Sequence, residues 1–543
     1  MPIRISCGDP VFDALPEAFA EWWTQSALSF ACGVSAGGVT ACGVTAGGVT
    51  ASGAGEVCGA KSDKRARIDF HEYSMSSWGG AFFANDLKSS LDVVLSSPLP
   101  DGSLFSNIEP LPTENHDAFA FNDHLRHLRL SRESLHADNE SNVVMAFFRA
   151  WQTSNDNAWL LKNLPTLQRA IEYSFAHPHR WSGELELPKR DFTLDRWPNA
   201  WGDTRENAPD EWSAPPQFPV VHAGDAARLF VACEQLAQLC AAVGQASDEE
   251  RWRERAAHLQ AQLNSIGWNG QFYTHAVHLM PLRVRGVDEA RQLAACNTFV
   301  MNSGIAESEQ CAAILREYQR RRELNLENSF CEWWSVQPPF PTEHFGVEKN
   351  HGANGGIWPL VGGELARAAL RNGFESLGVE TLRRFHELAV VPRRSFACYG
   401  LDGAPERNEY SISHDVVGAS CMLRALVEGV CGVVDKGATF SDITLAPRWP
   451  ATGHLTSQVE VSYAAHPNDV TYRWALDGGR MTLDYESKAK HVAFDLLLPR
   501  GNTPERVAFN GRTHEYTLAT VEKSKYVRFE TDKKRGAVAI TLK

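Results

Sequence analysis

NHGANGGIWPLVGGELARAALR, at Asn350–Arg371, joins a polar glycine-rich turn to a strongly apolar helix. Gly355 and Gly356 can adopt backbone geometries and close approaches that side chains forbid. Trp358 and Pro359 then lead into the helix. An indole and side-chain amides at the mouth of a buried helix suit a sugar pocket, although a plain helix start with a core tryptophan gives the same pattern. The stretch therefore predicts a buried helix that is preceded by a candidate binding turn.

Helices of two kinds alternate along the chain on both sides of this stretch. Helices that are apolar on every side are expected to be inner helices, and helices with one apolar face are expected to be outer helices. A weaker pattern near residues 80–95 is counted as a sixth inner helix. The alternation therefore predicts a mainly α fold, an (α/α)6 toroid of six helical hairpins. The expected inner helices are 142–151, 222–243, 296–301, 356–371 and 415–430, and the outer ones are 159–175, 249–266, 307–321 and 377–388.

The pattern changes after Gly432, where apolar and polar residues alternate with period two between Gly, Asn and Pro. This change predicts a C-terminal antiparallel β-sandwich over residues 434–543. We assign residues 68–433 to the helical, catalytic domain. Residues 1–67 are expected to form a low-complexity or flexible region, because ACGVSAGGVT is followed directly by ACGVTAGGVT within residues 31–50.

Composition narrows the class of protein. The 543 residues are 43% hydrophobic and 22% charged, which is typical of a globular chain with more than one domain. The net charge of -13 disfavours nucleic acid and anionic membrane as partners. No signal peptide or transmembrane run is visible, so we expect a cytoplasmic location. The 12 cysteines lack CxxC or zinc spacing, and we expect no metal and no cofactor; the oligomeric state stays open.

Three long loops that precede inner helices concentrate carboxylates and tryptophans. A single acidic loop fits a solvated surface, but three of them favour a common site at one end of the toroid. In the first loop, Trp197 could desolvate Asp195 and raise the pKa of its carboxyl group, as a general acid requires. The loops lie at 176–221, 325–354 and 395–414.

Paired carboxylates of this kind cleave glycosidic bonds. One carboxylic acid protonates the leaving oxygen, and a second carboxylate activates water or attacks carbon. Separations of about 6.5–9.5 Å give inversion of the anomeric centre, and about 5–5.5 Å gives retention. Loops from different hairpins can face one another across a toroid at the larger spacing, which favours an inverting enzyme.

The region from about Glu133 to Ala451 resembles the six-hairpin glycosidase superfamily, which includes processing α-glucosidases, trehalases, amylo-α-1,6-glucosidase-like proteins and α-L-rhamnosidases. The resemblance implies a glycoside hydrolase that acts from the non-reducing end on an oligosaccharide or glycoside. LDRWP resembles the element whose Asp is the general acid in the α-glucosidase branch, which implies Asp195 as the acid. The segments that carry the resemblance are ADNESNVVMAFFRAW, KRDFTLDRWPNAWGD, WNGQFYTH, NGGIWPLVGGELARAAL and HDVVGASCMLRALVEGV.

The base is less well marked. Where that branch has a Glu before a Tyr, this chain has Ala397-Cys398-Tyr399, without a carboxylate. We therefore predict Glu409 as the base, and Glu348 as the second choice. The residues predicted to bind the sugar are Trp197, Trp201, Asp203, Trp333, His351, Asn354 and Trp358.

Two alternatives stay open. The chain could be a non-catalytic carbohydrate-binding homologue that has lost its base. It could also be an α-toroid polysaccharide lyase, in which His344, His351, Tyr399 or Arg407 would serve a uronate substrate. A lyase releases an unsaturated uronate that absorbs ultraviolet light, and a hydrolase does not.

Overall fold

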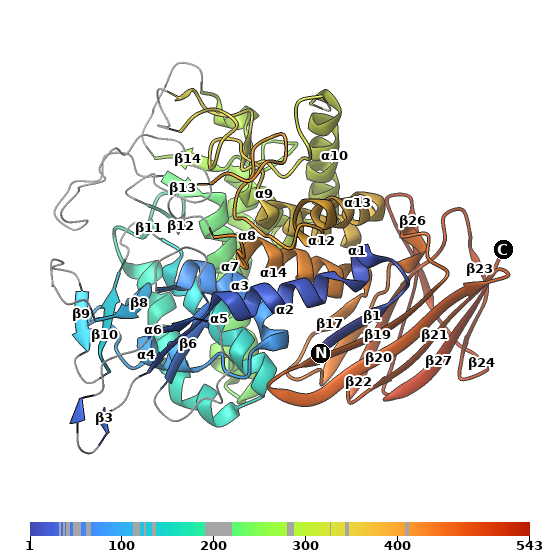
Figure 1. Ribbon diagram of the computed structural model, residues 1–543, viewed down its shortest axis with the longest axis horizontal. Helices are drawn as coiled ribbons and strands as arrows, with labels where there is room; N and C mark the ends of the chain where they lie inside the picture. Colours follow the sequence, from blue (N-terminus) through green and yellow to red (C-terminus); the bar gives the residue numbers. More distant parts are fainter. Residues whose placement is uncertain are drawn as a thin grey trace.

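The structure is a computed structural model with a body of helices beside a body of strands (Figure 1). The N-terminal strand lies within the strand-rich body, beside strands from the far end of the chain (Figure 1). None of the helices formed by the described residues is long and apolar enough to cross a membrane. The structure describes residues 1–31, 34–35, 38–39, 44–46, 56–60, 67–111, 120–123, 126–132, 137–190, 220–279, 287–325, 327–342, 347–407 and 412–543.

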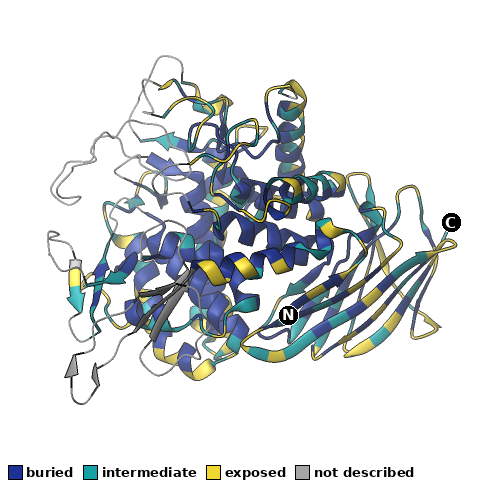
Figure 2. Cartoon of the chain, in the orientation of Figure 1, coloured by how far each residue is buried: buried dark blue, intermediate teal, exposed yellow. Residues whose placement is uncertain are grey.

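The inner helices form a closed ring. Each helix packs against the next one in chain order, and the last packs back against the first. Nearly all of their residues are buried, so these helices appear dark blue in Figure 2. Helices that are apolar all round have no face for solvent, and the ring satisfies this constraint. In ring order they are α3 (Phe70–Phe83), α5 (Asn139–Ser154), α7 (Ala223–Ala242), α9 (Cys296–Ser303), α12 (Pro359–Arg371) and α14 (Val417–Arg424).

The first inner helix lies earlier in the chain than expected. We predicted it near residues 80–95, but α3 ends at Phe83 and the next helix, α4 (Ser89–Leu95), packs against α5 and α6. The segment of α3 is rich in serine and glycine, which hides its helical periodicity in the sequence. Gly80 is needed there because a Cβ atom would lie 2.2 Å from the Trp23 ring.

The outer helices bury one face each. In α8, for example, Trp252, Ala256, Leu259 and Leu263 recur at helical spacing and are buried, while the charged residues face outward. These helices pack on the inner ring where the sequence predicted them. They are α6 (Asn157–Ala176), α8 (Ala246–Gly267), α10 (Ser308–Leu324) and α13 (Glu375–Phe385).

The N-terminus is more ordered than expected, because residues 3–26 form regular structure rather than a flexible region. Strand β1 (Ile3–Ser6) pairs antiparallel with β19 (Thr456–Tyr463). Helix α2 (Leu15–Ser26) buries Trp22 and packs on α3 and α14. The partners of both elements lie far away in the sequence, so local patterns do not reveal them. Most of the decapeptide repeat lies outside the described residues.

The C-terminal strands form two sheets with buried and exposed residues in alternation, as the sequence predicted (Figure 2). One sheet has the order β1-β19-β20-β21-β27-β23-β24 and the other β17-β18-β22-β26-β25. The pairings within residues 433–543 are antiparallel except that β18 pairs with β22 in parallel. The bounds are β17 Val433–Asp435, β18 Asp442–Leu445, β20 His466–Asp477, β21 Arg480–Ser487, β22 His491–Leu497, β23 Pro504–Phe509, β24 Arg512–Thr513, β25 Thr517–Val521, β26 Ser524–Thr531 and β27 Arg535–Leu542.

Closure of the ring depends on a close approach of α12 to α14. At Gly363 a Cβ atom would lie 2.4 Å from the backbone carbonyl carbon of Cys421 and 2.5 Å from the backbone nitrogen of Met422. We predict that Gly363→Ala forces these helices apart and destabilises the protein by about 2 kcal/mol or more, since overpacking of a core has costs of this size. Thermal unfolding measures the effect. Gly183→Ala, where a Cβ meets no atom within 4 Å, is the matched control, and an equal melting temperature for both variants would contradict the prediction.

Candidate active site

The loops that lead into the inner helices are joined to one another by short strand pairs. Strand β13 (Val220–His222), directly before α7, pairs with β14 (Ala276–His278) in the loop before α9. Strand β15 (Leu293–Ala294), close before α9, pairs with β16 (Val336–Gln337) in the loop before α12. The starts of these three inner helices therefore lie at the same end of the ring.

Isolated bridges continue the same arrangement to α14. Ile357, next to the start of α12, pairs with Trp334 on one side and Tyr399 on the other. Ser395 and His414 pair across the loop that leads into α14. We call these joined segments, residues 220–222, 276–278, 293–294, 334–337, 357, 395–399 and 414, the loop collar. The collar fixes the end of the ring at which the acidic loops were expected to meet.

A buried charge cluster lies at the starts of α3, α5 and α7. Asp138, directly before α5, is 3.4 Å from His71 Nδ1 and 3.4 Å from Arg228 Nε. Burial opposes ionisation of Asp138, but the charges of His71 and Arg228 outweigh it and lower the pKa of this carboxyl group well below its usual range. Arg228 also donates a hydrogen bond to Asn142 Oδ1. The cluster ties three inner helices together through an ionised carboxylate.

A second buried pair lies beside it. Arg190 Nε and a terminal nitrogen of Arg190 donate to the two oxygens of Asp225, at 2.5 Å each. Burial raises the pKa of Asp225, although Arg190 acts in the opposite direction. Burial and the Arg190 charge hold the pKa of His222 well below its usual value, so that its ring is neutral at neutral pH. Its Nδ1 lies 3.2 Å from the carbonyl oxygen of His275.

Asp415 supplies a different kind of carboxyl group at the start of α14. It is buried, and one of its oxygens accepts a hydrogen bond of 3.1 Å from the backbone N–H of Gly418. Its other oxygen has no hydrogen-bond partner among the described residues. Burial raises the pKa of Asp415 to about 6. This end of the ring thus holds carboxyl groups with widely different proton affinities, which acid–base chemistry requires.

Five of the predicted site residues lie outside the described residues. They are the predicted acid, the first-choice base and three of the predicted sugar-binding residues. Their roles stay predictions. These residues are Asp195, Glu409, Trp197, Trp201 and Asp203.

The remaining predicted residues lie around the glycine-rich turn before α12. The His351 ring nitrogen Nδ1 lies 3.1 Å from Glu406 Oε1, and the His351 side chain is 53% exposed. Glu348, the second-choice base, is exposed. Trp358 is half-buried at the position before α12, and Trp333, whose carbonyl accepts from the Trp358 N–H at 2.9 Å, is fully buried. The structure thus brings these residues together beside the loop collar.

Asn354 is buried within the same turn. Its side-chain oxygen accepts from the Phe340 N–H at 2.8 Å, and its nitrogen donates to the carbonyl oxygens of Phe340 and Val347. These bonds hold the loop before α12 in shape.

The glycines behave as the sequence predicted, since Gly355 has φ of 103° and a Cβ on Gly356 would lie 2.7 Å from the Gly352 nitrogen. The sugar-binding roles of the residues in this turn stay predictions.

Sequence reasoning missed the buried carboxylates and their cationic partners. Except for Arg190, which lies far from any described helix in the sequence, each of them lies in or next to an apolar helix, where a charged residue needs a partner to be buried. A charged residue in an otherwise apolar helix was therefore a usable signal, but it does not name the partner. The missed residues are His71, Asp138, Arg190, Asp225, Arg228 and Asp415. Among the described residues, no three or more His, Cys, Asp and Glu side chains are grouped so that they could hold a metal ion.

Comparison with solved structures finds the same fold in α-L-rhamnosidases. The GH78 family rhamnosidase of Bacillus sp. GL1 matches with a TM-score of 0.59 at 13% identity, over 91% of this chain and 43% of that chain. The α-L-rhamnosidase from Dictyoglumus thermophilum matches with a TM-score of 0.58 at 10% identity, over 99% of this chain and 50% of that chain. The α-L-rhamnosidase from Aspergillus terreus matches with a TM-score of 0.53 at 12% identity, over 98% of this chain and 50% of that chain.

These matches confirm, at the level of the fold, the resemblance to glycosidases that the sequence suggested. The chain spans about half the length of the rhamnosidases it matches. No protein-family model matches the sequence, and no curated protein sequence matches it.

The burial of Asp415 predicts a pH dependence of stability. Because the folded protein binds the Asp415 proton more tightly than the unfolded chain, stability falls as the pH rises from about 4 to about 6. Asparagine keeps an acceptor for the Gly418 N–H but carries no charge. We predict that Asp415→Asn stabilises the protein by up to about 3 kcal/mol at pH 8 and by little at pH 4.

Thermal unfolding of Asp415→Asn at both pH values measures this effect. Asp402→Asn is the control, because Asp402 is exposed and also accepts a backbone N–H, that of Ala404 at 2.9 Å. A gain in melting temperature that is the same at pH 4 and pH 8 would contradict the assignment of the raised pKa.

Proposed function

We propose that this chain is a glycoside hydrolase built on an (α/α)6 barrel of six helical hairpins, with α2 as the outer helix between α14 and α3. We propose further that it inverts the anomeric centre and removes sugars from the non-reducing end. The observation that supports this most strongly is the order of the inner helices in the ring. The helix that follows the loop of the predicted acid lies opposite the helix that follows the loop of the predicted base.

The opposite positions of these two helices follow from the contacts between neighbouring inner helices. From α14 the ring runs through α3 and α5 to α7 in one direction, and through α12 and α9 to α7 in the other. The loop before α7 carries Asp195, and the loop before α14 carries Glu409. Loops on opposite sides of a ring axis leave room between two carboxyl groups for both a sugar ring and a water molecule. This supports the larger separation, about 6.5–9.5 Å, that inversion requires.

The base of the loop that carries Asp195 is firmly anchored. Arg190 and Val220 exchange two backbone hydrogen bonds, of 2.9 and 3.0 Å, and so close the loop where it leaves the collar. The Arg190 side chain is held by Asp225 on α7. Asp195 follows this anchor closely in the sequence. A short tether to a rigid base favours precise placement of a catalytic side chain.

The fold neighbours suggest which substrates to try first. Since three of the solved structures that match this fold are named as rhamnosidases, we propose α-L-rhamnosides as the first class to assay. Trp358, half-buried beside the collar, is the described aromatic residue that we propose to contact the sugar.

Replacement of the acid is the direct test of the catalytic assignment. We predict that Asp195→Asn lowers kcat by about 10²–10⁴-fold without a change in melting temperature, because general acid catalysis contributes rate enhancements of this size. Asp210→Asn, in the same loop, is the matched control and should retain activity. Near-normal turnover by a folded Asp195→Asn variant would show that another group protonates the leaving oxygen.

The two candidate bases can be separated in the same assay. We predict that Glu409→Gln lowers kcat by about 10²-fold or more, whereas Glu348→Gln has little effect, since Glu348 precedes α12, which does not lie opposite α7 in the ring. Kinetic measurements on both variants, with circular dichroism to check folding, decide between them. The reverse result would assign the base to the turn before α12.

A further inference from the structure

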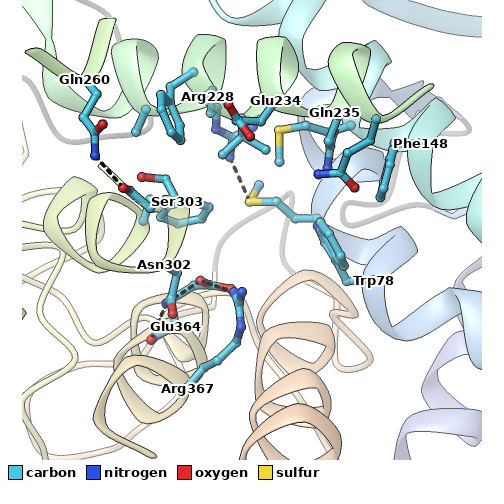
Figure 3. Close-up of a pocket in the computed structure, with 18 of the residues that line it drawn as sticks. Trp78, Phe148, Arg228, Glu234, Gln235, Gln260, Asn302, Ser303, Glu364 and Arg367 are labelled. Carbon is cyan, nitrogen blue, oxygen red and sulfur yellow. Dashed lines mark hydrogen bonds and ion pairs between the residues drawn. The ribbon is translucent and has the colours of Figure 1, made fainter. Parts of the chain in front are cut away.

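A cavity of about 500 Å³ lies inside the ring and away from the loop collar. Figure 3 shows residues from the middle and later turns of the inner helices around it, among them Trp78, Gln235, Asn302 and Arg367. Arg228 links the two regions, because it pairs with Asp138 near the start of α5 and also lines the cavity. A cavity of this volume is within the range of small-molecule sites.

The cavity has an opening because α9 is short. Helix α9 has 8 residues and α7 has 20, so at the α-helical rise they extend about 12 Å and about 30 Å. The lining therefore includes Ser303 and Gly304, where α9 ends, and Gln260 of the outer helix α8. Gln260 donates a hydrogen bond of 2.9 Å to the Gly304 carbonyl oxygen, which fixes this edge of the opening.

The side-chain oxygen of Gln235 in the lining lacks a hydrogen-bond partner within the part of the chain that the structure describes. Gln235 is only 6% exposed. A buried amide oxygen without a partner costs about 1–3 kcal/mol. Such a group in a cavity wall indicates a ligand or water that donates a hydrogen bond to it.

Among the described residues, the guanidinium groups of Arg424 and Arg367 have fewer acceptors nearby than they have donors. Arg424 donates from Nε to Glu428 Oε1 at 2.9 Å, and its next carboxylate, that of Glu364, is 3.9 Å away. Arg367 meets Glu364 at 3.2 Å and Glu428 at 2.9 Å. A guanidinium group has five N–H donors, so both side chains can donate further hydrogen bonds into the cavity. Burial lowers the pKa of Arg424 to about 10, and the group therefore stays cationic at neutral pH.

Trp78 holds these cations in place rather than offering a surface to a sugar. The Arg424 guanidinium lies 3.4 Å from the centre of the Trp78 ring system, and that of Arg149 lies 3.8 Å from it. Such cation–π contacts fix the plane of a guanidinium group. A ligand in this cavity is therefore recognised through hydrogen bonds and charge rather than by stacking on Trp78.

The lining combines these donors with acceptors. Asn302 donates from Nδ2 to Glu364 Oε2 at 2.8 Å, which leaves the Asn302 amide oxygen as an acceptor. Glu364 and Glu234 are anionic neighbours that disfavour a doubly charged ligand such as phosphate. Phe148, Phe230 and Phe299 provide apolar walls. The chemistry that matches this lining is a molecule with one negative charge and several hydroxyl groups.

We propose that this cavity is a binding site for a sugar acid, a monosaccharide-sized molecule that carries one carboxylate and several hydroxyl groups. The carboxylate accepts hydrogen bonds from Arg424 and Arg367, in the geometry that guanidinium groups favour. A hydroxyl group donates to the Gln235 oxygen. This site goes beyond the proposed hydrolysis, because its residues lie in the ring interior and not in the loops that carry the candidate catalytic acids.

Calorimetric titration of the full chain tests the proposal. The probes are D-glucuronate, D-galacturonate and D-gluconate, with D-glucose, D-galactose and inorganic phosphate as comparisons. We expect at least one sugar acid to bind about tenfold or more tightly than the neutral sugar of the same configuration and than phosphate, since loss of one charge-assisted hydrogen bond corresponds to a factor of this size.

Gln235→Leu provides the critical variant. Leucine has a similar size and removes an unsatisfied polar group, so the melting temperature should be unchanged or raised while the dissociation constant for the sugar acid rises about tenfold. Gln262→Leu, on the α8 helix but outside the cavity lining, is the matched control and should bind as the original chain does. Arg424→Lys keeps the charge but loses the planar fork, and should weaken binding of the sugar acid in a folded protein.

Three results would overturn the proposal. The first is that none of the sugar acids binds. The second is that a neutral sugar or phosphate binds as tightly as the best sugar acid, which would remove the role of the single carboxylate. The third is an unchanged dissociation constant in Gln235→Leu, which would place the bound acid elsewhere.

Discussion

The structure depends on the burial of inner helices against one another in a closed ring. A helix in such a ring has no face for solvent, so each charged side chain on it must find a partner or a cavity. Asp138 meets His71 and Arg228 near the loop collar, and Glu428 meets Arg367 and Arg424 at the other end of the ring. Except for Arg424 and Glu428, which are four residues apart, these pairs join segments that are far apart in the sequence.

The same constraint separates the residues that stabilise the ring from the residues that are available for a functional site. Because most side chains of the inner helices are buried against one another, we expect the catalytic groups in the loops that the collar joins at one end. The collar joins the starts of α7, α9, α12 and α14 through short strand pairs, so those loops leave from fixed points. A cavity next to the short helix α9 is an exception inside the ring, and there the side-chain oxygen of Gln235 has no hydrogen-bond partner among the described residues.

Much of the architecture could be predicted from local patterns. The apolar stretches around Val143, Leu236 and Leu365 predicted inner helices, and the period-two alternation after Gly432 predicted the sandwich strands. The serine- and glycine-rich α3 and the N-terminal β1 were missed, because both depend on distant partners such as Trp23 and Val461.

The candidate site was predicted less completely than the fold. Acidic residues in long loops attract attention in a sequence, but a buried carboxyl group is decided by distant partners. Asp415 lies one residue beyond the loop that the sequence singled out, and only its burial at the start of α14 gives it a raised pKa. Asn354 was predicted from the sequence to bind sugar, but the sequence did not indicate that its side chain hydrogen-bonds to Phe340 and Val347 and so holds the loop before α12. The sequence could indicate which residue types and which loops belong to the site. It could not indicate which side chains pair with one another.

The central claim is that the loops at the collar end of the ring cleave a glycosidic bond with inversion. The most direct measurement is a proton NMR time course of the purified chain with aryl α-L-rhamnosides and a panel of other glycosides. The account predicts release of a free sugar whose first-formed anomer is opposite in configuration to the substrate. Release of the same anomer would contradict inversion and the opposed placement of the two carboxylates. An unsaturated uronate as the product, or no turnover of any glycoside by the folded chain, would contradict hydrolysis itself.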